Sequence, residues 1–229
     1  MDQSAPTHGY PFDLPVVKAL RESPIEFHPK VTYLVGENGT GKSTLLEAIA
    51  VALGFNAEGG TTNLKFSTRD THSDLEIYLR VSRGKKPRRD FFFRAESFYN
   101  VASALDDINA TEYYGDRSLH AQSHGESFLT LARAKFKYDG LFLLDEPEAA
   151  LSPARQLTIL SIIHQAVEDR CQYVIATHSP ILMAYPDSWI YSLNEEGLSR
   201  VEYDDTEHVQ ITRNFLACPS RMMRYLFND

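Results

Sequence analysis

The chain has 229 residues, 43% hydrophobic and 24% charged, a composition typical of one large globular α/β domain. Its 31 acidic residues outnumber the 23 Lys and Arg residues, and the formal net charge of −8 indicates a chain that is not built as a general binder of nucleic acid or membrane surfaces, although it leaves room for a local basic patch. No apolar run approaches the roughly 20 residues that span a bilayer, and the N-terminus lacks the apolar core of a signal peptide. Because Cys171 and Cys218 lie far apart and suit reduced thiols, we expect a cytoplasmic protein.

The first half of the chain predicts a short strand, a helix and a hairpin. A Pro-rich segment to residue 29 reads as extended, residues 31–35 as a buried strand, and residues 43–53 as a helix, since their apolar positions recur at helical spacing. Residues 74–81 alternate apolar and polar, which predicts a half-buried antiparallel strand. With residues 91–93 as its partner strand, we expect a hairpin whose basic tip spans Arg83 to Arg89.

The second half predicts a mainly parallel sheet. Residues 95–114 read as helical, whereas residues 141–144 and 173–176 are wholly apolar runs typical of central strands. A helix at about 154–169 supplies the crossover between them, so the sheet should be mainly parallel. Residues 189–203 resemble a further hairpin, and the chain from residue 206 should be helical.

A phosphate-binding loop stands between the first strand and the helix that follows. The loop matches the P-loop pattern without a substitution, and Thr44 follows it. Glycines let successive backbone N–H groups turn toward phosphate oxygens, and the helix N-terminus adds its positive dipole end. Lys42 should reach the β- and γ-phosphates, and the Ser43 hydroxyl should bind Mg²⁺. The predicted ATP-binding residues of this loop are Gly36, Glu37, Asn38, Gly39, Thr40, Gly41, Lys42, Ser43 and Thr44.

The remaining catalytic groups are expected at the carboxyl ends of two central strands. Asp145 and Glu146 follow the apolar run 141–144, and ligands bind at that end of a parallel sheet. Asp145 is placed to hold Mg²⁺, and Glu146 to accept a proton from the attacking water. His178 follows the run 173–176, and we expect it to contact the γ-phosphate.

These motifs resemble those of the ABC-type ATPases, and particularly their soluble RecF- or SMC-related branch. Residues 36–44 match Walker A, residues 141–146 match Walker B, and His178 matches the H-loop histidine. The phrase from Asp145 to Pro153 looks like Walker B running into a D-loop, although Ser152 replaces the usual aspartate. The resemblance covers nearly the whole chain. It implies a single P-loop NTPase domain over residues 1–229, with a mainly parallel sheet core, an antiparallel β region and a helical signature subdomain at about 95–135.

Two further motifs depart from the family pattern. The best match to the signature motif is Gln122-Ser123-His124-Gly125-Glu126, in which His124 replaces the first glycine. By resemblance, Ser123 and Gly125 would contact the ATP held by a second subunit, while Ser123 with Glu126 also fits a simple helix cap. Glu96 stands where the family's Q-loop glutamine is expected, and by that resemblance it is a candidate ligand of Mg²⁺.

The resemblance implies a Mg²⁺-dependent ATPase that closes head-to-tail as a homodimer around ATP and gates a protein or nucleic-acid partner. Two other roles are alternatives: the cytoplasmic ATP-binding subunit of a membrane transporter, and a non-catalytic ATP-dependent scaffold. Glu146 argues against the scaffold, and the variant signature argues mildly against the transporter. We expect the basic tip at Arg83 to Arg89 to be a solvated surface, and nucleic-acid contact is the alternative.

Overall fold

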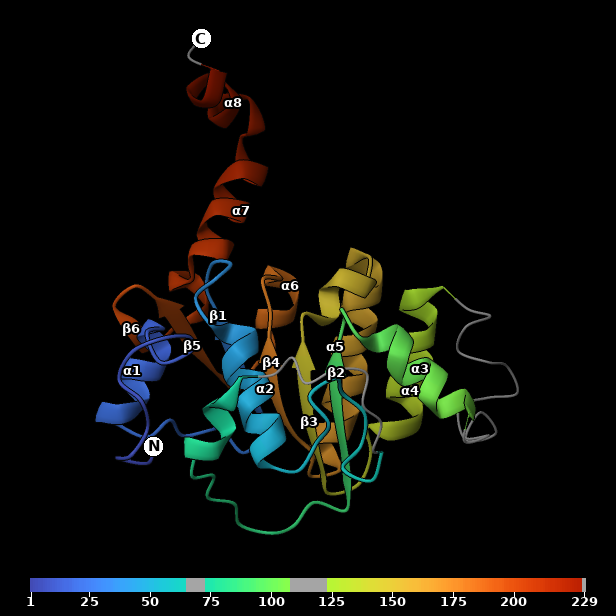
Figure 1. Ribbon diagram of the computed structural model, residues 1–229. Coiled ribbons are helices and arrows are strands. Elements are labelled where there is room, and N and C mark those ends of the chain that lie inside the picture. Colours follow the sequence, from blue (N-terminus) through green and yellow to red (C-terminus); the bar gives the residue numbers. More distant parts are fainter. Residues whose placement is uncertain (65–72, 108–122, 228–229) are drawn as a thin grey trace.

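The computed structural model describes residues 1–64, 73–107 and 123–227 (Figure 1). A six-stranded sheet has the spatial order β2-β3-β4-β1-β5-β6. All neighbouring strands run parallel except β5 and β6, which form an antiparallel hairpin. The strands are β1 (Val31–Val35), β2 (Arg89–Arg94), β3 (Gly140–Asp145), β4 (Gln172–Ala176), β5 (Ser188–Asn194) and β6 (Gly197–Val201). The predicted α/β fold with a mainly parallel sheet is confirmed, and so is the second hairpin.

Helices cover both faces of the sheet and produce two apolar cores. One face is covered by α1 (Pro15–Glu22), α2 (Lys42–Ala52) and the 3-10 turn η1 (Asp74–Tyr78). The other is covered by α3 (Phe98–Asp107), α4 (His124–Lys135), α5 (Pro153–Glu168) and α6 (Pro180–Met183). Tyr33 and Leu34, neighbours on β1, are both fully buried and belong to opposite cores. Burial on both faces explains why the central strands read as unbroken apolar runs.

The expected hairpin at residues 74–93 is wrong. Residues 74–78 form η1, and of its apolar side chains Leu75 is buried whereas Ile77 is 68% exposed. β2 pairs instead with β3, in parallel, and on its other side the described residues form a single bridge, from Phe92 to Gly60. Among the described residues, the alternation of residues 74–81 therefore has no partner strand. Arg83 to Arg88 form an irregular connection that leads into β2 at Arg89, rather than a hairpin tip.

The N-terminal segment also differs from expectation, because it contains α1. Pro15 occupies the first turn of that helix, where its missing N–H costs nothing, and Val16, Val17 and Leu20 are buried against the sheet. The expected helix at 95–114 is found as α3 up to Asp107, and its remainder and Gln122 lie outside the described residues.

After β6 come the 3-10 turn η5 (Tyr203–Asp205) and the predicted C-terminal helices, α7 (Glu207–Ala217) and α8 (Pro219–Phe227). Figure 1 shows both standing away from the body of the domain, and we call them the C-terminal arm. No helix among the described residues is both long and apolar enough to cross a membrane.

Candidate active site

The phosphate loop folds as predicted between β1 and α2. Gly36 has φ +146°, and a Cβ there would lie 2.1 Å from the carbonyl oxygen of Leu193 on β5, so only glycine fits. Gly41 caps α2 with φ +95°, in the left-handed region that glycine adopts without strain. The loop therefore brings the free N–H groups of the first turn of α2 to the carboxyl ends of the strands.

Lys42 is the cation of the loop, and it is only 4% exposed. Its ammonium donates hydrogen bonds to the carbonyl oxygens of Gly36, at 2.8 Å, and Glu37, at 2.9 Å. Burial lowers the pKa of Lys42, while the nearby carboxylates of Glu146 and Asp145 act in the opposite direction. A buried ammonium among carboxylates is a strong point of attachment for polyphosphate oxygens.

Ser43 and Asp145, the two residues predicted to bind Mg²⁺, lie side by side, and we call them the metal pair. The Ser43 hydroxyl donates to Oδ1 of Asp145 at 2.9 Å. Burial raises the pKa of Asp145 to about 6, against the lowering effect of Arg94, whose Nε lies 3.6 Å from Oδ2. A hydroxyl and a carboxylate are hard oxygen donors of the kind that Mg²⁺ prefers, and a buried carboxylate with a raised pKa gains from a nearby cation. The residues present therefore fit Mg²⁺.

Glu146 and His178 face each other beside this pair. Glu146 has φ +50°, an unusual backbone for a side chain of this type, and its N–H donates to the carbonyl of Ala176 at 2.9 Å. That turn leaves Oε1 of Glu146 3.6 Å from Nε2 of His178, a buried ring nitrogen that has no hydrogen-bond partner among the described residues. Strained backbone of this kind gathers at functional sites.

His178 is held from two further sides. Its backbone N–H donates to Oε1 of Glu148 at 2.5 Å, and its Nδ1 lies 3.0 Å from Nε2 of His208, in the first turn of α7. Burial, followed by the charge of Lys42, lowers the pKa of His178, which favours the neutral ring. His208 also lines a cleft of about 600 Å³ with Gly36 to Thr40 of the phosphate loop. The root of the C-terminal arm therefore lies at the active site.

The signature residues lie on a different part of the chain. Ser123 precedes α4, and its backbone N–H and hydroxyl donate to the Glu126 carboxylate at 3.2 and 2.9 Å, so the helix cap expected from the sequence is present. Arg155 of α5 donates to the Ser123 hydroxyl at 3.2 Å and to Glu126 at 3.1 Å. Gly125 is packed so closely that a Cβ would lie 2.5 Å from the carbonyl of Ala150. In the described ranges, no hydrogen bond joins Ser123 or Gly125 to the phosphate loop of the same chain.

Glu96 lies close to the metal pair but points outward. Its side chain is 89% exposed, and its carboxylate is 3.8 Å from Arg94. Its charge contributes to the raised pKa of Asp145, after the effects of burial, Arg94, Ser43 and Glu146. A role for Glu96 as a ligand of Mg²⁺ stays a prediction.

Sequence reasoning missed four residues of this region. Arg94 reaches the site because the register of β2 on β3 places it beside Asp145. Arg155 reaches Ser123 because α5 packs on α4. His208 follows the β5–β6 hairpin, so no local motif marks it. The Tyr10 hydroxyl lies 3.0 Å from the Thr44 hydroxyl, and the Tyr10 ring is 72% exposed beside the phosphate loop. An aromatic residue in the N-terminal segment is the sequence signal that could have led to it.

Comparison with known proteins places the chain in a family. A model of the AAA domain family matches residues 17–149, more than half of the chain. The chain is 31% identical over 198 residues to the molybdate import ATP-binding protein MolC of Haemophilus influenzae, across 80% of this chain and 74% of that protein. It is 29% identical over 166 residues to the iron(3+)-hydroxamate import ATP-binding protein FhuC of Bacillus subtilis, across 64% of this chain and 61% of that protein.

Two solved structures are also similar. The structure of cbiO1 from Clostridium perfringens, part of the ABC transporter complex cbiONQ, aligns with a TM-score of 0.45 at 20% identity, covering 88% of each chain. The SMC head domain from Thermotoga maritima aligns with a TM-score of 0.44 at 16% identity, covering 78% of this chain and 92% of that one. Neither similarity bears on activity. On the family match and the ATP-binding relatives, the chain belongs to the AAA domain family and to the ABC-type ATPase superfamily.

Proposed function

We propose that the protein hydrolyses ATP in a Mg²⁺-dependent reaction. The observation that carries this proposal is that two pairs of side chains lie beside Lys42. The Ser43 hydroxyl lies 2.9 Å from Oδ1 of Asp145, and Oε1 of Glu146 lies 3.6 Å from Nε2 of His178. These residues come from three strand ends, and together they supply a phosphate cradle, a metal pair and a base. Phosphoryl transfer needs positioning and charge stabilisation of this kind more than covalent chemistry.

Each residue has a distinct role in the proposed reaction. Lys42 and the loop N–H groups hold the β- and γ-phosphates, and Mg²⁺, when bound at Ser43 and Asp145, offsets charge on their oxygens. Glu146 accepts a proton from water as the water oxygen bonds to the γ-phosphorus. The bond from that phosphorus to the β–γ bridging oxygen breaks, and ADP leaves with the electron pair. Tyr10, which is exposed beside Thr44, would offer its ring to the adenine base.

The neutral ring of His178 would donate to the γ-phosphate through Nε2. A neutral imidazole has a single N–H, and Nε2 faces the Glu146 carboxylate, an acceptor. If Nε2–H of His208 donates to Nδ1 of His178, the proton of His178 is left on Nε2, where the anions are. His208 would therefore select the tautomer that stabilises the transferring phosphoryl group.

We further propose that two copies close head-to-tail around two ATP molecules. Ser123 is exposed at the start of α4, and Arg155 places a guanidinium beside its hydroxyl, so this corner could complete the ATP site of a second subunit. Light scattering of Glu146→Gln with and without Mg-ATP tests the closure. A dimer only with Mg-ATP supports it, whereas a monomer in both conditions contradicts it.

A second candidate is the ATP-binding subunit of a membrane importer, because the two relatives described above are import ATP-binding proteins. Co-purification from the native host separates the candidates. A stoichiometric membrane-spanning partner would establish the importer role, and its absence with an ATP-dependent homodimer would favour a cytoplasmic ATPase that gates a protein or nucleic-acid partner.

A further inference from the structure

The edge of the sheet opposite the active site gathers much of the positive charge of this acidic chain. Three segments meet there, residues 83–90, 133–139 and 165–170, and we call them the basic face. They contain nine Lys and Arg residues and four carboxylates, so the remaining 14 bases and 27 acids leave the rest of the chain strongly negative. The bases are Arg83, Lys85, Lys86, Arg88, Arg89, Arg133, Lys135, Lys137 and Arg170, and the acids are Asp90, Asp139, Glu168 and Asp169.

Contacts around one residue join the three segments. The Asp139 carboxylate accepts from Nε of Arg170 at 2.7 Å and lies 3.5 Å from Nε of Arg88. The carbonyl of Asp139 accepts from the N–H of Arg88, and its N–H donates to the carbonyl of Asp169, both at 2.9 Å. The cations therefore belong to one continuous surface.

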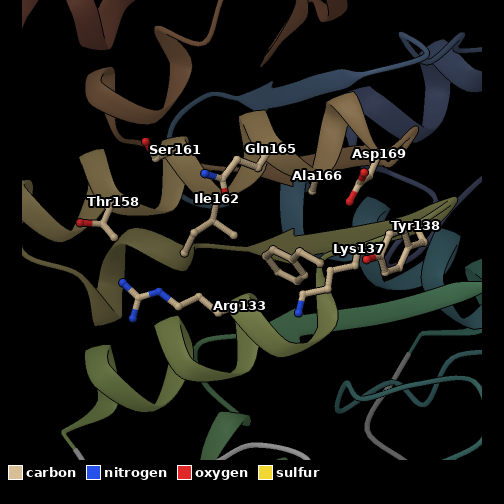
Figure 2. A pocket seen from close by; sticks show the side chains of 10 residues that line it. Arg133, Lys137, Tyr138, Thr158, Ser161, Ile162, Gln165, Ala166 and Asp169 are labelled. Carbon is tan, nitrogen blue, oxygen red and sulfur yellow. The ribbon is translucent and has the colours of Figure 1, made fainter.

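A polar groove opens on this surface. Figure 2 shows it between α4 and α5, with Arg133 and Lys137 on one wall and Thr158, Ser161 and Gln165 on the other. Its volume is about 480 Å³. Ser161 and Gln165 are exposed and stand one helical turn apart, so they present hydrogen-bonding groups along the groove opposite the cations.

The groove ends at an aromatic side chain on a strained turn. Tyr138 is 55% exposed, and the guanidinium of Arg89 lies 6.0 Å from the centre of its ring. Among the described residues, five other than glycine have positive φ, and three of them belong to the basic face: Tyr138, Asp139 and Arg170. A side chain adopts this left-handed backbone only at a cost in free energy, and strained backbone of this kind gathers at functional sites.

We propose that the basic face binds single-stranded nucleic acid. Exposed cations along a groove can follow a phosphate backbone, and an exposed tyrosine beside an arginine offers a platform for an unpaired base. The polar wall of α5 supplies hydrogen bonds to phosphate and sugar oxygens. This inference concerns the edge opposite the ATP site and does not rest on ATP hydrolysis.

Fluorescence anisotropy with a labelled single-stranded DNA of about 20 nucleotides, without ATP, tests the proposal over about 50–300 mM salt. The variant Lys86→Gln/Arg133→Gln/Lys137→Gln should bind at least about tenfold more weakly than wild type at the lowest salt. Its log–log salt slope should be shallower by about 2, because each lost phosphate contact removes roughly 0.7. The control Lys18→Gln/Arg221→Gln/Arg224→Gln removes three cations elsewhere and should bind like wild type.

Equal binding by the two triple variants would overturn the basic face as the site, as would no binding by wild type. Tyr138→Leu should weaken binding of the single strand about tenfold, the value of one base stack, while Tyr138→Phe retains it. Equal affinity for a duplex of the same length, or for polyglutamate, would overturn the assignment to single strands or to nucleic acid. Because ATP is absent throughout, an inactive ATPase would leave these results unchanged.

Discussion

The two ends of the central strands carry charge in opposite ways. At the carboxyl ends, the ionisable groups are few and individually held: the buried Lys42 by two carbonyls, the buried Asp145 by Ser43, and the partly buried His178 by Glu148 and His208. At the amino ends of β2 and β3, the charges are numerous, and most of the cations are exposed. Buried charges interact strongly and in fixed geometry, whereas exposed ones are screened and act together. Single substitutions should therefore have large effects at the carboxyl ends of the strands, and small, salt-dependent effects at the amino ends.

The largest expected effect is that of Glu146→Gln. The amide keeps the shape of the side chain but cannot accept the proton of the attacking water, so kcat should fall by about 10²–10⁴. Phosphate release in steady state measures kcat, and binding of a fluorescent ATP analogue, which should persist, serves as the control. Wild-type turnover would mean that another group positions the water.

Lys42→Ala should follow, with kcat/KM lower by at least about 10²–10³, since a preorganised donor to the phosphates is lost. Lys18→Ala, on the exposed face of α1, is the matched control and should leave kcat/KM unchanged. The same release assay measures both variants. Full activity of Lys42→Ala would refute the assignment of the phosphate site.

Asp145→Asn should stabilise the protein without ATP, in a pH-dependent way. Burial raises the pKa of Asp145 from 3.8 to about 6, so the folded wild type binds more protons than the unfolded chain between these values and loses stability as the pH rises through them. The variant should gain about 1–3 kcal/mol over wild type at pH 8 and little at pH 4. Urea unfolding at both pH values measures the gain, and a gain independent of pH would contradict the cause.

His208→Leu should lower kcat about tenfold, because it removes a hydrogen bond worth roughly 1.4 kcal/mol to the transition state, while KM for ATP changes little. His208→Gln can present an amide N–H to Nδ1 of His178 and should restore kcat to within about twofold of wild type. A merely structural role for His208 would not be rescued in this way. Equal loss in both variants would contradict the tautomer argument.

The smallest effect is expected at the basic face. Lys86→Gln alone should weaken binding of single-stranded DNA only about twofold to threefold at low salt, and less at higher salt, since one screened charge among nine is lost. Anisotropy titrations at two salt concentrations measure the change. A loss as large as that of the triple variant would show that the cations do not act together.

The sequence predicted the residues at the carboxyl ends of the strands far better than the residues that surround them. The phosphate loop, Asp145 and His178 are marked by local spacing and by strands buried on both faces. Arg94 reaches Asp145 through strand register, and His208 reaches His178 after a hairpin, so both depend on pairing that no local pattern encodes. The alternation of residues 74–81 wrongly predicted a strand. An alternating pattern shows that a segment could form a half-buried strand, but β2, its expected partner, pairs with β3 instead.

Because His208 contacts His178 at the start of α7, a small tilt of α7 at this point would move the far end of the helix much further. α7 has 11 residues and is therefore about 16 Å long. A tilt of about 10° at its root, where His208 meets the active site, would carry its far end through roughly 3 Å and α8 through more. Ile211, Leu216 and Phe227, all at least half exposed, would sweep with it. A small change in the contact between His208 and His178 would therefore become a larger displacement at the far end of the C-terminal arm, with no change in the sheet.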